Sequence, residues 1–183
     1  MVHRQRGDTL VEVLMSTVIL SLVIVGAITV MARGLKAAQL SVEHTQVRFQ
    51  INAQLQILRY LRDGYVTDAS SNAGQTWSTL FTAPQGYASA AASTYNDTCS
   101  VTSSKTGFYL TQSGGNVAIN QFNPGNKPAS YALPGQGLWI EMTRSSGISP
   151  AYVDILLRGC WSGIGDSTDQ SAVTAVRLYD PAH

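Results

Sequence analysis

The sequence predicts an α+β fold in which a long amino-terminal helical spine, membrane-spanning in its first half, packs against a mostly antiparallel β-sheet head. Three observations predict this fold. Residues 13–32 carry no formal charge, residues 8–62 contain no proline, and the region after residue 106 alternates strand-like segments with turns rich in Gly, Asn and Ser.

Composition excludes several classes of protein. The chain has 183 residues, of which 13% are charged, and its formal net charge is +1. Soluble proteins usually have about 25% charged residues. A nucleic-acid binder needs a dense basic surface, so this composition argues against that class. The length allows one modest domain plus an extension.

The uncharged run is the clearest single feature. Residues 13–32 would form a helix of about 30 Å, the thickness of the hydrocarbon core of a bilayer. A secretory signal peptide is the alternative, but its apolar region would be about 7–15 residues long and would precede a small-x-small cleavage site. The sequence after the run, at residues 33–36, offers no such site.

Basic residues alone do not decide the orientation of this span. Arg4 and Arg6 precede it, and Arg33 and Lys36 follow it. The downstream region is polar, weakly charged and contains two cysteines, which suits an oxidising exterior. We therefore expect the amino end to face the cytoplasm.

The residues before the span form a recognisable motif. Residues 4–14 read Arg-Gln-Arg-Gly-Asp-Thr-Leu-Val-Glu-Val-Leu, in which a short basic leader ends at Gly7 and an acid, Glu12, stands five positions later. This resembles the class III signal of type IV prepilins and pseudopilins, which a membrane-embedded aspartic peptidase cuts after the glycine. A glycine suits that bond because no Cβ obstructs a narrow cleft. A carboxylate at the mouth of an apolar helix is costly and predicts a function.

The resemblance implies roles for the first mature residues. Asp8 would become the amino terminus and the site of N-methylation, although the family commonly has Phe or Met there. Glu12 would neutralise the freed amine of a neighbouring subunit and set the stagger between helices. Thr9, Leu10 and Val11 would accompany Glu12 in subunit assembly.

The resemblance also implies a location and partners. A precursor inserted once in the cytoplasmic membrane would be extracted into an extracellular filament. The implied partners are identical or related pilin subunits, the prepilin peptidase, the assembly platform of the inner membrane, and lipid before assembly. No cofactor is implied, and we do not expect the isolated subunit to bind nucleic acid.

Beyond the span, the helix is expected to continue to a stop at Asp63-Gly64. It carries two apolar stripes on nearly opposite sides. One contains Leu40, Val47, Ile51, Leu55 and Leu58, and the other contains Leu35, Phe49, Ala53, Ile57 and Tyr60. Two stripes suggest one face against the head and one against other subunits, and the alternative is a helix fully buried in one fold.

The chain therefore divides into a cleaved leader at 1–7, a membrane and assembly segment at 8–32, an exposed amphipathic segment at 33–63, and a β-rich head at 64–183. Residues 65–98 look rich in loops. Strands are expected at 107–112, 116–122, 138–144, 152–161 and 172–179. Their tight spacing without intervening helices predicts an antiparallel sheet.

Little in the head suggests chemistry. Cys99 and Cys160 either form a disulfide or remain two thiols, with Cys160 simply buried. Asp166 and Asp169 have too few neighbouring oxygens for a calcium loop and suggest a solvated turn. The sequence has no catalytic or metal-binding motif, which predicts a protein that is not an enzyme.

Three functions remain open at this stage. The first is a major or minor pilin of a type IV pilus-like filament that serves adhesion, motility or DNA uptake. The second is a pseudopilin of a type II secretion or competence apparatus. The third is a single-span surface protein whose head binds a ligand without polymerising, which would retain its leader and tolerate loss of the Glu12 carboxylate.

Overall fold

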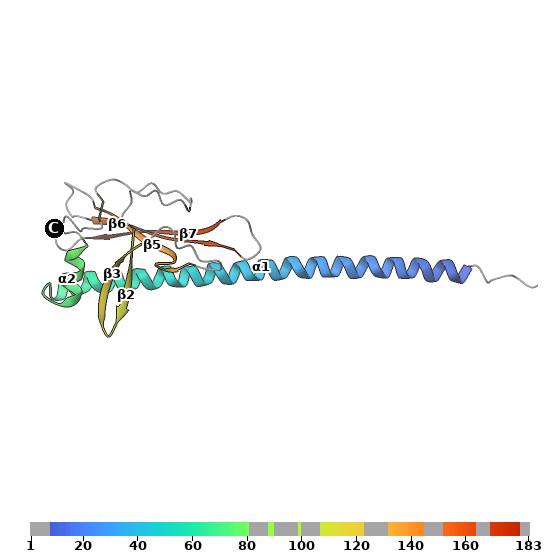
Figure 1. The fold of residues 1–183 in the computed structure, drawn as a ribbon, viewed down its shortest axis with the longest axis horizontal. Helices are drawn as coiled ribbons and strands as arrows, with labels where there is room; N and C mark the ends of the chain where they lie inside the picture. The colour runs from blue at the N-terminus through green and yellow to red at the C-terminus, as the bar shows by residue number, and fades with distance from the viewer. Residues whose placement is uncertain are drawn as a thin grey trace, which may run out of the picture. The chain divides into compact units, whose positions relative to one another are not determined.

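A computed structural model describes residues 8–80, 88–89, 99, 107–122, 132–144, 152–163 and 169–179. Two helices and seven strands lie within these ranges (Figure 1). They are α1 (Asp8–Thr67), α2 (Asn72–Thr79), β1 (Ala88–Ser89), β2 (Phe108–Ser113), β3 (Asn116–Gln121), β4 (Leu133–Pro134), β5 (Gly137–Arg144), β6 (Tyr152–Ser162) and β7 (Asp169–Tyr179). The α+β prediction is confirmed, and the five expected strands each appear within three residues of their expected bounds.

The strands form one sheet in the order β3-β2-β5-β6-β7, with every pair along this path antiparallel. The sequence did not predict two short strands, β1 and β4, which both pair with β5 in the parallel direction. The β2–β3 hairpin turns at Gly114 and Gly115, whose φ angles of 58° and 84° suit a two-glycine turn between right-twisted strands.

The chain divides into two units, residues 1–42 and residues 43–183. In the second unit the sheet lies along the carboxyl-terminal part of α1 (Figure 1). The core between the sheet and this part of α1 contains Val47, Ile51, Leu58 and Leu61 from the helix and alternate residues of β2, β5 and β6. Alternation follows from the pleat of the strands, which points successive side chains to opposite faces.

One apolar stripe of α1 is therefore buried and the other is not. Val47, Ile51 and Leu58 are at most 1% exposed. On the opposite side, Phe49 is 71% exposed and Tyr60 is 51% exposed. The alternative of a fully buried helix is wrong, since Leu35, Phe49 and Tyr60 of the second stripe are exposed, although Ile57 packs against the edge of the core.

The prediction that α1 stops at Asp63-Gly64 is wrong. The helix continues through Gly64 to Thr67, and the expected loop contains α2, whose Ser71 caps the helix by accepting from the Gly74 amide. A Cβ on Gly64 would lie 2.6 Å from the Cβ of Ala73. The glycine therefore allows α2 to approach α1 closely, which is a packing role rather than a helix stop.

Candidate functional site

The amino-terminal half of α1 contains the predicted assembly residues. The helix begins at Asp8, and Gly7, the residue predicted to precede the scissile bond, lies outside the described residues. Every residue from Leu10 to Gln39 is exposed, and Leu10 and Val11 are 65% and 57% exposed. An apolar helix of this length, without contacts from its own chain, needs lipid or other protein around it.

Hydroxyl groups interrupt this apolar surface, but the helix satisfies them itself. Ser16 Oγ donates to the Glu12 carbonyl at 2.8 Å, and Ser21 Oγ donates to the Thr17 carbonyl at the same distance. Thr29 Oγ1 donates to the Val25 carbonyl at 2.8 Å. Because these polar groups are paired within the helix, they add little to the cost of placing it in lipid.

The Glu12 carboxylate differs from those hydroxyls. Its side chain is exposed, and within the described part of the chain it receives no hydrogen bond and no cation. Arg33 and Lys36, the first basic groups after the apolar run, are likewise exposed and form no ion pair with described residues. Charges at both ends of the apolar helix thus remain available to groups outside the chain.

Three contacts hold the second part of α1 on the sheet. The indole Nε1 of Trp161 donates to Glu43 Oε2 at 3.0 Å. Gln54, which is 3% exposed, donates from Nε2 to the Leu110 carbonyl and accepts from the Leu110 amide on Oε1, both at 2.9 Å. At Gly159 the helix is so close that a Cβ would lie 2.6 Å from Val47 Cγ1. These contacts leave the stripe containing Phe49 facing outward.

Gln54 completes the hydrogen bonding of β2. That strand pairs with β5 only at Phe108 and Ile140, so Leu110 lacks a backbone partner on that side. The carboxamide supplies one donor and one acceptor, as a neighbouring strand would. This role was not predicted from the sequence, although Gln54 stands within the buried apolar stripe, where a polar side chain needs a partner.

The far face of the sheet is also buried around a disulfide. Cys99 and Cys160 are joined, with their Cα atoms 5.7 Å apart, which confirms the disulfide and excludes the two free thiols. Trp139 stacks on Phe122 with ring centroids 4.8 Å apart. Beside them Glu141 Oε1 accepts from Trp139 Nε1 at 3.0 Å, and Arg158 Nε lies 3.4 Å from the same oxygen. This buried ion pair was not predicted, because charged residues alternating in a strand suggest a solvated face.

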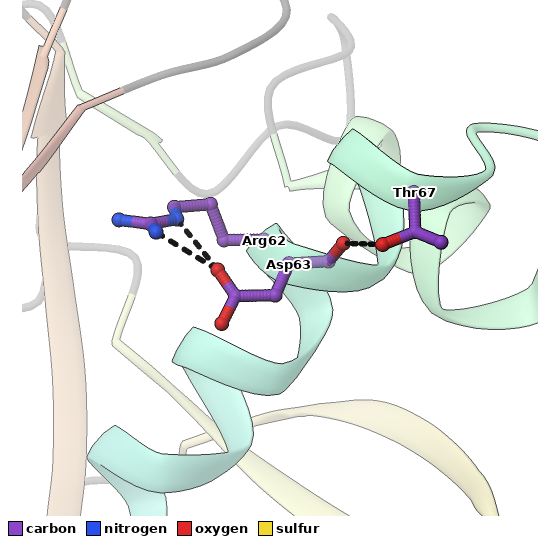
Figure 2. A network of polar contacts seen from close by, with 3 residues as sticks. All are labelled: Arg62, Asp63 and Thr67. Atoms are coloured by element: carbon purple, nitrogen blue, oxygen red, sulfur yellow. Dashed lines mark hydrogen bonds and ion pairs between the residues drawn. The ribbon is translucent and has the colours of Figure 1, made fainter.

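The end of α1 is closed by local polar contacts (Figure 2). The Arg62 guanidinium lies 2.8 Å from Asp63 Oδ1, and Thr67 Oγ1 donates to the Asp63 carbonyl at 2.9 Å. The Asp68 amide then donates to the Gly64 carbonyl at 2.9 Å. The Asp68 amide thereby satisfies the Gly64 carbonyl, which the helix terminus would otherwise leave unpaired. The Arg62–Asp63 pair is exposed and contributes little stability.

Two features of the described ranges bear on function. In these ranges α1, from Leu10 onward, is long and apolar enough to cross a membrane, and its most apolar stretch has no buried residue. No group of three or more His, Cys, Asp and Glu residues in these ranges is arranged to hold a metal ion. Asp166 lies outside the described residues, so the solvated turn expected there stays a prediction.

Comparison with known proteins identifies the amino-terminal segment. Residues 2–28 match the prokaryotic N-terminal methylation motif, which supports a type IV pilin-like prepilin. No curated protein and no solved structure matched the chain. The motif covers Gly7, Asp8 and Glu12, whose roles in cleavage, methylation and assembly stay predictions. Type IV pilin-like proteins are structural and not enzymatic.

Proposed function

Because its amino-terminal segment carries the signal of type IV pilin-like prepilins, we propose that the chain is a filament subunit that polymerises through α1. A peptidase cuts after Gly7, and the helix beginning at Asp8 stays in the membrane with the head outside. An assembly machine then moves this helix into a bundle formed by the helices of other subunits. The same proposal covers pili and the pseudopili of secretion or competence machines, since both use this signal.

The observation that carries this proposal is the exposed stripe beyond the apolar run. The exposed run of α1 from Leu10 to Ala32 already spans about 34 Å, which fills a bilayer core. Phe49 lies 17 residues further, about 25 Å along the helix axis, yet is 71% exposed. Lipid around the span does not reach so far, so this stripe is left available to another protein surface, and the helices of other subunits supply one.

The carboxylate of Glu12 gives the proposal its direct test. In a bundle from which lipid has gone, a neighbour's terminal amine would neutralise it, and an unpaired carboxylate there would cost several kcal/mol. We expect Glu12→Val to insert in the membrane and mature normally while filaments sheared from cells are lost. Ser16→Val is the matched control, because the Ser16 hydroxyl only bonds its own helix.

Processing is tested separately at the leader. Gly7→Phe should leave a precursor that is heavier by the leader, because the cleavage site needs a residue without a Cβ. Normal filaments from Glu12→Val, or normal maturation of Gly7→Phe, would contradict the proposal and favour a single-span surface protein that does not polymerise.

A further inference from the structure

The first part of α1 has an unusual charge distribution. Residues 8–42 contain only four charged side chains, which are Asp8, Glu12, Arg33 and Lys36. Both acids stand before the apolar run and both bases stand after it. The formal charges of this segment therefore cancel, although the acids and bases are separated by an uncharged helix.

The spacing prevents these charges from meeting within one chain. Glu12 and Lys36 are 24 residues apart, about 36 Å along the helix axis, and Asp8 and Arg33 are 25 residues apart, about 37 Å. A continuous helix cannot fold back across that distance. A parallel copy displaced along the axis by the same length would bring both bases level with both acids.

We infer that a second copy of this chain docks in that register, parallel and displaced by about 36 Å, with Arg33 and Lys36 of one copy against Asp8 and Glu12 of the next. The inference rests on the proposed function and adds a second inter-subunit contact to it. The contact of Glu12 with a freed amine would need a displacement of only about 6 Å, so the two contacts involve different neighbours.

Charge burial makes this register selective. As helices leave lipid and water for a bundle, each unpaired charge costs several kcal/mol, and paired charges avoid that cost. A displacement shorter by seven residues, about 10 Å, would set the bases against the apolar run. Buried polar pairs of this kind are known to fix the register of helices, whereas the surrounding apolar surface would accept many displacements.

Removing both bases tests the register. In the full chain, Arg33→Gln/Lys36→Gln should insert and mature, yet its filament yield should fall at least about tenfold, which is equivalent to about 1.4 kcal/mol or more per contact. Arg48→Gln/Arg59→Gln is the matched control, because it removes two exposed bases of the same helix that lie outside the register. The control should assemble like the wild type.

Cross-linking measures the displacement itself. Val13→Cys/Ala37→Cys places two thiols 24 residues apart on exposed positions, while the native cysteines are already joined to each other. Oxidised filaments should give a ladder of disulfide-linked multimers on non-reducing gels. Val13→Cys/Val30→Cys, with the thiols 17 residues apart and therefore about 10 Å out of register, should not.

The outcomes separate the register from the function. Wild-type filaments without the 13–37 ladder, or normal filament yields from Arg33→Gln/Lys36→Gln, would overturn the register and leave the proposed function standing. If the two bases only bind lipid phosphate groups, filaments of that variant would keep the wild-type ladder in the cysteine background, which would overturn the pairing of the bases with the acids although the displacement itself would stand. A wild-type chain that never polymerises removes both proposals.

Discussion

Replacing Gln54 with leucine tests the attachment of the helix to the sheet. The side chain makes two hydrogen bonds of 2.9 Å to Leu110, and both residues are at most 3% exposed. Each buried backbone group left without a partner costs about 1–3 kcal/mol, so two cost about 2–6 kcal/mol. Burial of the leucine side chain offsets about 1.5–3 kcal/mol, so the middle of the two ranges leaves an expected net loss of about 2 kcal/mol.

The assay is urea unfolding of the detergent-solubilised full chain, followed by tryptophan fluorescence. Gln56→Leu is the matched control, because Gln56 is exposed on the same helix and its replacement should change stability by about 0.5 kcal/mol or less. Gln54→Glu keeps the acceptor for the Leu110 amide but places a carboxylate oxygen against the Leu110 carbonyl oxygen. The free energy of unfolding of this variant should therefore rise as the pH falls and the carboxyl group becomes a donor. Equal midpoints for Gln54→Leu and Gln56→Leu would refute the reasoning.

Three further predictions concern the head. Reduction of the disulfide between Cys99 and Cys160, which are 61 positions apart, should lower the free energy of unfolding by about 4 kcal/mol; denaturation with and without reductant measures this, and unchanged midpoints would contradict it. Gly159→Ala should cost about 1–3 kcal/mol, because the added methyl meets α1 at 2.6 Å; a neutral effect in the same assay would show that the helix shifts freely. Hydrogen bonds from Ser70 lower the pKa of Asp68 below its ordinary value of 3.8. The stability that these bonds add is therefore complete above pH 3.8 and disappears as the pH falls through the lowered pKa. The difference in unfolding free energy between the wild type and Ser70→Ala should close in acid, and a difference that widens there would contradict the assignment.

The parts of the fold that could be predicted from the sequence are those that local patterns of residues encode. The absence of proline and charge predicts the first half of α1, and alternation with glycine turns predicts β2, β3, β5, β6 and β7. The leader, glycine and acid predict the signal, because these features are contiguous in the chain. Properties carried by neighbouring residues are therefore readable without a structure.

Features that depend on distant residues were not predictable in this way. Gly64 resembles a helix stop locally, but its role depends on Ala73 across a helix crossing. The two hydrogen bonds between Gln54 and Leu110 form because β2 pairs with β5 at one position only and then diverges from it. Glu141 and Arg158 resemble solvated strand residues in the sequence, but both are buried beside the cluster of Phe122, Trp139 and the disulfide. Tertiary packing decides each case, and one-dimensional patterns do not encode it.

The mass of the amino-terminal peptide of the protein recovered from cells tests the central claim most directly. A chain trimmed by the peptidase and assembled through α1 begins at Asp8, with or without a methyl group on its amine. A chain that begins at Met1, or at any residue beyond Ala32, would contradict the account, because either the signal would be unused or the helix that joins the subunits would be gone.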